Sequence, residues 1–498
     1  MVLPAHKLSA APAPSAASGP AAAPASAPEL ELVAPAPDKF ALTKLEMPTK
    51  PGSPFDRNFW KRISTLANRP LAYSPTVDYL DDGAAAMQAR LDNIAAAKST
   101  IVMSTYVVEC DSAGYTMLDA LTAAAKRGVK VAVCFDMVPE SFVNGEASDK
   151  NKKTLADKLA ALGAAGGVIC FYGHDEQMSD SLLSGNHLKL LLCDGAKAIA
   201  GGRNVGKDYF DGDWGDFDLG TSGTLAPQIG ERVANTLKHT EYSESYVGDR
   251  KHPSLATQAR FAAFMNDFQR DIITAKRNAE VTAQRALSQG HSPGTPLVLT
   301  TFNPSSDLRP AKPGESPNAI TQALIETINR ARTEIMVSCN YINGGDGIME
   351  ALMNAARRGV SVNIVTTSRT TSERSMMPYD NAHRWYGQLT AAGVRIWETY
   401  HNEHEKVVVV DNELGCTGSY NIELAAEEKL VEQMTWSADP TFVSRIHKKM
   451  TDVIEKSCKL YTPAAEPKLE WWQILFAPFY FPAHWIYVAF AYLLRKMI

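Results

Sequence analysis

Residues 187–194 read HLKLLLCD, and residues 201–204, a few positions later, read GGRN. A second segment, 404–411, reads HEKVVVVD and is followed at 418–421 by GSYN. The second set repeats the first at one constant offset, because 404 − 187 and 421 − 204 both give 217. A histidine, a lysine, an aspartate, a glycine and an asparagine recur in one register, which indicates an internal duplication rather than a chance match.

Each segment predicts a β-hairpin. The apolar residues that follow the lysine are typical of a buried strand, and Asp-Gly at 194–195 or Asp-Asn at 411–412 suits a two-residue turn. Histidine and lysine at positions i and i+2 of a strand point to the same face. The return strand brings Asn204 or Asn421 back beside that face. An imidazole, an ammonium and an amide then converge, and such a set binds phosphate oxygens.

Two further stretches resemble each other. Residues 95–106 and 330–341 each read as a helix end that runs into a buried strand. Each is followed by an apolar helix that ends in basic residues and a glycine, and then at once by another strand. Strand–helix–strand units of this length imply a right-handed parallel crossover, so we expect an α/β sheet in each half. These helices and strands are expected at 118–128, 129–135, 348–359 and 360–365.

One half of the chain supplies one histidine, and two similar lobes packed about a pseudo-twofold axis would place both sets around a single phosphodiester. Displacement at phosphorus needs a nucleophile on one side and a proton donor for the leaving group on the other. His187 and His404 can fill these roles, while Lys189 and Lys406 stabilise the charge on the non-bridging oxygens. This arrangement requires no metal or cofactor, and the sequence has no Cys/His cluster with metal-ligand spacing.

At these residues the chain resembles the phospholipase D superfamily over about 55–455, and looks most like its bacterial cardiolipin synthase-like branch, which pairs a GGxN with a GSxN. The resemblance implies a two-lobed α/β/α fold with the active site at the lobe interface, a covalent phosphohistidine and metal-independent transfer. It implies that His187 is the nucleophile and His404 the general acid and base. Asp194 and Asp411 belong to the same catalytic motifs, where they would steady the site rather than attack.

The resemblance extends to further residues. Asn204, Asn421 and Ser419 would bind the substrate phosphate, and Asp216 and Glu432 would be the carboxylates that orient the histidines. Two features depart from the family pattern. After Asn421 the chain reads IELAA rather than the Asp-Pro-Arg-Ser run frequent in cardiolipin synthases, and it lacks the two N-terminal transmembrane helices usual in one class of them. Both departures concern the exact substrate and leave the expected fold and chemistry in place.

The overall charge argues against a nucleic-acid substrate. The 498 residues include 50 Lys and Arg against 55 Asp and Glu, a net charge of −5. No general basic field is therefore available to collect a polyanion, whereas a nuclease needs a basic channel for the backbone. The seven cysteines are scattered, several of them in apolar strand-like runs, which favours buried reduced thiols and a reducing compartment.

The two ends of the chain have distinct compositions. Residues 1–50 are rich in Ala, Pro and Ser and predict a disordered tail. From Trp471 to Leu494 no charged residue occurs and ten positions are aromatic, which suits either the headgroup region of a membrane or docking on the body as core. The expected division is a tail at 1–50, lobe 1 at 55–245, a helical connector at 246–295, lobe 2 at 296–460 and an aromatic segment at 461–498.

The sequence thus predicts a membrane-associated bacterial enzyme, on the cytoplasmic face, that acts on a phospholipid and binds membranes through 471–498. The leading reaction is phosphatidyl transfer, with cardiolipin synthesis from phosphatidylglycerol as the example. A hydrolytic phospholipase D, a phosphodiesterase nuclease on the same scaffold and an inactive membrane-binding scaffold are the alternatives. The acceptor, the headgroup and the oligomeric state are left open, although the duplication means that one chain suffices to build the site.

Overall fold

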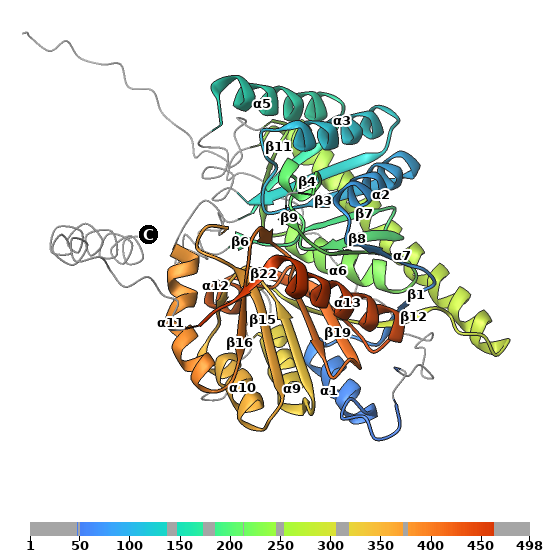
Figure 1. The fold of residues 1–498 in the computed structure, drawn as a ribbon. Coiled ribbons are helices and arrows are strands. Elements are labelled where there is room, and N and C mark those ends of the chain that lie inside the picture. Colours follow the sequence, from blue (N-terminus) through green and yellow to red (C-terminus); the bar gives the residue numbers. More distant parts are fainter. Residues whose placement is uncertain are drawn as a thin grey trace, which may run out of the picture. The chain divides into compact units, whose positions relative to one another are not determined.

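Figure 1 shows the computed structural model of the chain. It describes residue 47 and residues 50–136, 147–172, 185–212, 214–245, 253–304, 318–371 and 377–462. Nearly all of the predicted N-terminal tail and the whole of segment 471–498 lie outside the described residues, and so does the expected membrane contact of that segment. Within the described ranges, none of the helices combines the length and apolar composition needed to traverse a lipid bilayer.

The first lobe is built on a mixed eight-stranded sheet in the order β11-β5-β4-β3-β7-β8-β10-β2. β3, β4 and β5 run parallel, and the other neighbours are antiparallel. The parallel part is the predicted strand–helix–strand crossover. The strands are β2 (Val77–Leu80), β3 (Thr100–Ser104), β4 (Lys130–Asp136), β5 (Val168–Tyr172), β7 (Leu190–Cys193), β8 (Lys197–Gly201), β10 (Asp218–Thr221) and β11 (Thr240–Ser243).

Helices cover both faces of this sheet (Figure 1). On one face, Leu118 of α3 and Leu159 of α5 pack against Val133 of β4. On the other face, Phe264 of α7 packs against Val102 of β3. The long helix α7 lies in the expected connector, yet its apolar side belongs to the core of lobe 1. The helices are α2 (Gly83–Ala96), α3 (Ser112–Lys126), α5 (Asp149–Ala164), η3 (Lys207–Tyr209), α6 (Leu225–Leu237) and α7 (Leu255–Ser288).

The second lobe repeats this strand order in the sheet β22-β16-β15-β13-β18-β19-β21-β12, with β1 added beyond β12. Again the three strands β13, β15 and β16 are parallel. The predicted α/β fold with two similar lobes is therefore confirmed. The strands are β1 (Ala72–Ser74), β12 (Thr295–Phe302), β13 (Glu334–Ser338), β15 (Ser361–Thr367), β16 (Arg395–Thr399), β18 (Val407–Val410), β19 (Leu414–Gly418), β21 (Leu430–Ser437) and β22 (Cys458–Leu460).

Helices also flank the second sheet. Leu324 of α9 and Leu352 of α10 pack against Ile364 of β15 on one face, and Phe442 of α13 packs against Val409 of β18 on the other. The helices are α1 (Arg57–Ala67), α9 (Ala319–Arg330), α10 (Asp346–Arg357), α11 (Met377–Ala391), α12 (Leu424–Glu428) and α13 (Pro440–Ser457), and a small pair of strands comprises β14 (Ile342–Asn343) and β20 (Ile422–Glu423).

The N-terminal boundary of lobe 1 differs from the expected residue 55. Phe59 and Ile63 of α1 are buried in the core of lobe 2, and β1 pairs antiparallel with β12 of the second sheet. The apolar side of α1 packs against α9 and β12 of lobe 2. Lobe 1 proper begins at β2, and residues 55–74 fold with lobe 2.

Two short strand pairs join the lobes. β6 (Gly185–Asn186) runs parallel to the start of β21, and β9 (Trp214–Gly215) runs parallel to β17 (Asn402–Glu403). In both pairs, the next residue on one lobe is a motif histidine and the next residue on the other lobe is a carboxylate. The same relation therefore occurs twice with the lobes exchanged, as a pseudo-twofold axis requires.

Candidate active site

His187 is held by the second lobe. It follows β6, and its backbone N–H donates to the carbonyl of Val431 over 3.1 Å. The pairing of Gly185 with Leu430 continues in register and sets His187 opposite Glu432. Nδ1 of His187 lies 2.7 Å from Oε1 of Glu432, and both side chains are buried. Backbone and carboxylate together fix the orientation of the imidazole.

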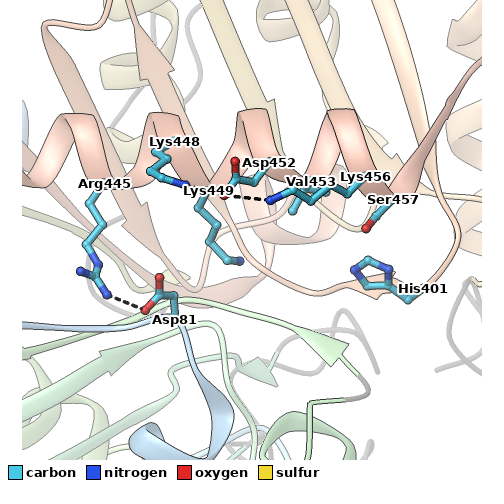
Figure 2. Close-up of a pocket in the computed structure, with 9 residues that line it drawn as sticks. All are labelled: Asp81, His401, Arg445, Lys448, Lys449, Asp452, Val453, Lys456 and Ser457. Carbon is cyan, nitrogen blue, oxygen red and sulfur yellow. Dashed lines mark hydrogen bonds and ion pairs between the residues drawn. The ribbon is translucent and has the colours of Figure 1, made fainter.

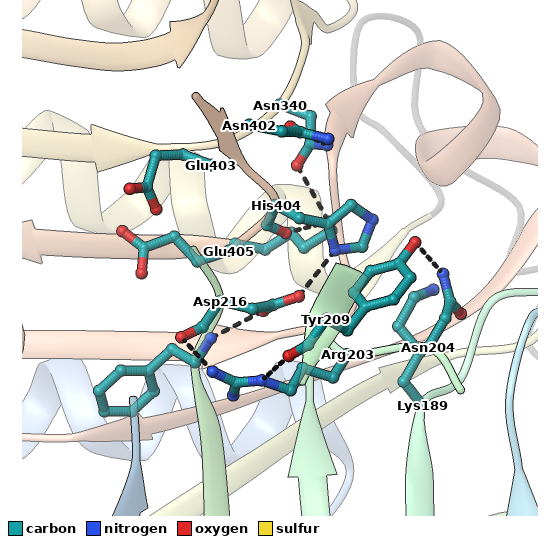
Figure 3. A network of polar contacts seen from close by, with 12 residues as sticks. Lys189, Arg203, Asn204, Tyr209, Asp216, Asn340, Asn402, Glu403, His404 and Glu405 are labelled. Atoms are coloured by element: carbon teal, nitrogen blue, oxygen red, sulfur yellow. Dashed lines mark hydrogen bonds and ion pairs between the residues drawn. The ribbon is translucent and has the colours of Figure 1, made fainter. Parts of the chain in front are cut away.

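His404 is held in the same way by the first lobe. Its backbone N–H donates to the carbonyl of Gly215 over 2.7 Å, and its Nδ1 lies 2.8 Å from Oδ2 of Asp216 (Figure 3). Arg203, which is buried, donates to the carbonyl of Asp216 and to the carboxylate of Asp218, and so anchors the chain around Asp216. Each histidine-orienting carboxylate thus comes from the opposite lobe, a relation that the sequence alone did not predict.

Lys189 and Lys406 are almost completely buried. Nζ of Lys189 donates to the carbonyl of His187 over 2.9 Å, and Nζ of Lys406 donates to the carbonyl of His404. Lys406 also donates to Oδ1 of Asn340 over 3.2 Å. Two ammonium groups beside two imidazoles in a water-poor interface favour the binding of an anion such as a phosphodiester.

The two motif asparagines lie three residues after the ends of the return strands β8 and β19, and both amides contact protein groups. Nδ2 of Asn204 donates to the hydroxyl of Tyr209 over 2.9 Å, and Nδ2 of Asn421 donates to Oε1 of Glu423 over 2.9 Å. These contacts hold the amides in place. Their expected binding of a substrate phosphate stays a prediction.

The hydroxyl of Ser419 contacts a buried carboxylate, and its expected binding of the substrate phosphate stays a prediction. Its hydroxyl donates to Oε2 of Glu432, so it acts on the carboxylate that orients His187. The equivalent residue of lobe 1 is Gly202, where a Cβ would lie 2.1 Å from Oδ1 of Asp216. Ser419 therefore lies beside the longer carboxylate side chain, Glu432, and Gly202 lies beside the shorter one, Asp216.

Asp194 and Asp411 lie at the hairpin turns, at the other end of the strand from the histidine. The carboxylate of Asp194 accepts the backbone N–H groups of residues 98–100, and that of Asp411 accepts those of 332–334. Both aspartates have positive φ angles, 52° and 54°, as a type I′ turn requires. These contacts cap the starts of β3 and β13, which fits the expected steadying role, and the grouping of both aspartates with the catalytic residues stays a prediction.

Aromatic side chains that the sequence analysis did not single out line the two histidines. The ring of Tyr106 meets His187 edge-on, with centroids 4.8 Å apart. Tyr209 meets His404 edge-on at 5.0 Å, and Trp214 stacks beside His404 at 5.9 Å. Tyr106 lies at the end of a repeated stretch and Trp214 lies two residues before Asp216, so position in the repeats was the available signal.

The two histidines have different electrostatic surroundings. Burial, with the charges of Lys189 and Lys406, lowers the pKa of His187. Burial raises the pKa of Glu432, and the charge of Lys189 and the Ser419 hydrogen bond oppose that effect. Geometry decides for the ionised carboxylate, because both oxygens of Glu432 face donors. A neutral His187 that donates from Nδ1 to this carboxylate keeps its lone pair on Nε2.

The carboxylate beside His404 behaves differently. Burial works to raise the pKa of Asp216, but the hydrogen bond from His404 and the charges of His404, Arg203 and Lys406 outweigh burial and lower that pKa below its ordinary value. An ionised Asp216 on Nδ1 stabilises the protonated form of His404. The two histidines therefore face carboxylates whose pKa values are shifted in opposite directions.

Behind His404 lies a partly buried ion cluster that we call the Lys449 cluster: Lys449, Glu403, Glu405 and His401. Glu403 and Glu405 are nearly inaccessible to solvent. Lys449 of α13 contacts both carboxylates, and Nε2 of His401 lies 2.6 Å from Oε1 of Glu403. Lys449 and His401 also line a surface pocket of about 410 Å³, which is bordered by a polar side of α13 and by Asp81 of lobe 1 (Figure 2).

A family model described as the cardiolipin synthase, phospholipase D-like domain matches the chain twice, over residues 91–216 and 324–454. The chain belongs to this family. Each match contains one HxKxxxxD motif of the phospholipase D-like family, and the first ends at Asp216. Within the described residues, no group of three or more His, Cys, Asp or Glu side chains is arranged to hold a metal ion.

Relatives in this phospholipase D-like family are distant. An uncharacterised protein of Helicobacter pylori (strain 26695) is 24% identical over 416 residues, which cover 76% of this chain and 80% of that protein. Cardiolipin synthase 2 of Bacillus anthracis is 24% identical, with 77% and 65% covered, and cardiolipin synthase B of Salmonella typhimurium is 22% identical, with 80% and 85% covered. The crystal structure of phosphatidylserine synthase from Haemophilus influenzae shares the fold, with a TM-score of 0.59, 15% identity and 85% and 98% covered.

Proposed function

We propose that the chain is a metal-independent phosphatidyltransferase that acts on phospholipids through a phosphohistidine. The observation that carries the proposal is the reciprocal pairing of the two histidines: each Nδ1 faces a buried carboxylate of the other lobe, with a buried lysine two residues further along. Relatives named cardiolipin synthase support a phospholipid as the substrate.

In the first step, Nε2 of His187 attacks the phosphorus of the phosphodiester. The bond between phosphorus and the headgroup oxygen breaks, and His404 gives its Nε2 proton to that oxygen, so the headgroup leaves as a neutral alcohol. The phosphatidyl group remains on His187. Lys189 and Lys406 stabilise the negative charge that builds on the non-bridging oxygens.

In the second step, His404 acts as the base. It takes the proton of an entering alcohol, whose oxygen attacks phosphorus while the bond between phosphorus and His187 breaks. An alcohol such as the glycerol headgroup of a second phosphatidylglycerol gives a new diester, and water gives phosphatidic acid. The assignment of His187 as the nucleophile is supported by its lowered pKa, which keeps the imidazole neutral, and that of His404 as the acid by its ionised partner Asp216.

Product analysis tests the reaction class. The full chain is incubated with phosphatidylglycerol vesicles, with and without ethanol, and separately with single-stranded DNA. We expect diphosphatidyl lipid and free glycerol from the vesicles, phosphatidylethanol when ethanol is present, and intact DNA. Cleaved DNA with untouched lipid would establish the nuclease alternative instead. Release of phosphatidic acid alone, even with ethanol, would establish hydrolysis.

The two-histidine mechanism has its own test. His187→Ala and His404→Ala should each abolish steady-state turnover. In His404→Gln the nucleophile remains, and a substrate with an acidic leaving group, such as a p-nitrophenyl ester, needs no proton from His404. We therefore expect a burst of one p-nitrophenol per chain and a phosphorylated His187 in this variant. Normal turnover in either alanine variant contradicts the mechanism.

We also propose that the enzyme is membrane-associated, on the cytoplasmic face of a bacterial membrane, and that residues 471–498 make the contact. Their aromatic composition suits the headgroup region. A chain truncated after residue 470 should lose sedimentation with phosphatidylglycerol vesicles while it retains its melting temperature. Unchanged sedimentation would overturn this role.

A further inference from the structure

Asn402 shares the strand face that carries the reactive groups. Side chains alternate along an extended chain, so Asn402, His404 and Lys406 point to one side and Glu403 and Glu405 to the other. Figure 3 shows the carboxylates of Glu403 and Glu405 directed away from the His404 ring. In the parallel pair β9·β17, Asn402 lies opposite Trp214, whose ring stacks beside His404.

The orientation of the Asn402 amide follows from its neighbours. Lys406 can only donate, so the atom of Asn340 that it contacts at 3.2 Å is the oxygen. The NH₂ group of Asn340 is then the group that faces Asn402, at 3.5 Å, and the atom of Asn402 that receives it is the oxygen Oδ1. The remaining amide nitrogen of Asn402 is therefore a donor that points elsewhere.

That donor has no acceptor within the part of the chain that the structure describes. Nδ2 of Asn402 is buried and makes no hydrogen bond there, although the residue is only 5% exposed. A buried N–H group without an acceptor carries a desolvation penalty of about 1–3 kcal/mol. Beside a substrate site, this penalty is removed when the bound substrate supplies the missing acceptor.

The motif that contains His404 has this amide donor, and the motif that contains His187 has no side chain at the equivalent position. The equivalent position of lobe 1 is Gly185, where a Cβ would lie 2.6 Å from Oδ2 of Asp136, so that lobe has no room for a side chain there. Under the proposed function, His404 is the group that exchanges a proton with the leaving and the entering alcohol. Asn402, two residues earlier on the strand, lies roughly 7 Å along the chain from it.

We propose that Nδ2 of Asn402 binds a second hydroxyl of a polyol alcohol while its reacting hydroxyl contacts His404, and that Asn402 thereby selects polyol headgroups and acceptors. This inference rests on the proposed function and specifies its acceptor. An uncharged N–H donor suits the oxygen of a neutral hydroxyl, whereas the charged phosphate is served by Lys189 and Lys406.

An internal competition tests the selection. Phosphatidylglycerol vesicles are incubated with the full chain, isotope-labelled glycerol and 1-propanol at equal concentrations, and the ratio of labelled phosphatidylglycerol to phosphatidylpropanol is measured. The two alcohols have the same carbon number and differ in hydroxyls. We expect Asn402→Ala to lower this ratio about fivefold, the factor that one hydrogen bond to an uncharged oxygen represents.

Two further variants complete the test. Asn363→Ala removes a buried amide of β15 in the same lobe, whose oxygen and nitrogen both have partners, and it should leave the ratio unchanged. Asn402→Asp keeps the shape and the acceptor for Asn340 but loses the donor, and it should lower the ratio at least as much, which covers the case in which the alanine variant does not fold.

Contrary outcomes are distinct. An equal ratio in wild type and both Asn402 variants overturns the selection. A loss of hydrolysis and of both transfers by one common factor also overturns it, because that result would place the amide on the phosphate. A wild-type chain that consumes no phospholipid overturns the proposed function and this inference together, whereas an active wild type with an unchanged ratio overturns this inference alone.

Discussion

His187 illustrates how one side chain links function to stability. The folded protein keeps it neutral by burial and by the nearby ammonium groups of Lys189 and Lys406, whereas in the unfolded chain it titrates near the ordinary histidine value of about 6.5. A neutral imidazole retains the lone pair that the proposed attack on phosphorus needs. The same shift makes folding sensitive to acid at this position.

The expected pH dependence has a definite sign. Because the folded pKa of His187 is lowered, the unfolded chain takes up a proton below about pH 6.5 that the folded chain does not. Wild type should therefore lose stability relative to His187→Gln as pH falls from 7.5 to 5.5, by up to about 1.4 kcal/mol per pH unit. Urea unfolding at the two pH values measures the difference. A gap that stays constant or widens in favour of wild type at low pH contradicts the shift.

At the scale of elements, the two hairpin turns tie the motif strands to the central strands of each sheet. Asp411 has a positive φ and accepts three backbone N–H groups at the start of β13, and its hydroxyl partner is Thr333. Asp194 does the same for β3. The strict recurrence of this aspartate in the motif thus has a structural explanation.

Asp411→Ala should therefore act on stability. We expect a loss of about 2 kcal/mol, since three backbone donors, one of them half-buried, lose their acceptor together, and a smaller effect on kcat of the molecules that remain folded. Thermal melting and initial rates measure the two quantities. Asp119→Ala, which removes an exposed carboxylate paired with Lys158, serves as the control and should change stability by less than about 0.5 kcal/mol. A large fall in kcat without destabilisation would support a catalytic role instead.

Helix α13 contributes the cation of the Lys449 cluster. Burial disfavours the charge of Lys449, but Glu405 and Glu403 outweigh burial and raise its pKa. Lys449→Met leaves two buried carboxylates without their cation, and we expect a loss of about 3–5 kcal/mol. Adding Glu405→Gln should recover part of it. Lys448→Met on the exposed side of the helix should have little effect. Melting temperatures measure these changes, and equal losses of stability in Lys449→Met and Lys448→Met would contradict the cluster's role.

Much of the fold and site could be predicted from the duplicated pattern. The spacing of His187, Lys189 and Asn204 and its recurrence placed the hairpins correctly, and the helix ends at Gly128 and Gly359 adopt the positive φ expected of a C-terminal cap. The reciprocal exchange of carboxylates could not be predicted, because it depends on how two lobes dock and not on local periodicity. The packing of residues 55–74 against lobe 2 was not predicted, for the same reason.

The whole molecule depends on close contact between the lobes. Gly215 accepts the backbone bond of His404, and a Cβ on it would lie 1.9 Å from Oε2 of Glu403. Gly215→Ala should therefore push β9 and β17 apart and lower kcat by about 100-fold, since small misplacements of a reacting group have effects of this size. Steady-state rates measure this. Gly387→Ala, at a helical position with no atom nearby, is the control. Wild-type rates in Gly215→Ala would show that the junction tolerates displacement.

The reciprocal strand pairs β6·β21 and β9·β17 limit the relative motion of the two lobes. Because each imidazole is anchored by the other lobe, any separation of the lobes would remove both anchors together. Under the proposed function, we therefore expect the substrate to enter and the product to leave without separation of the two lobes.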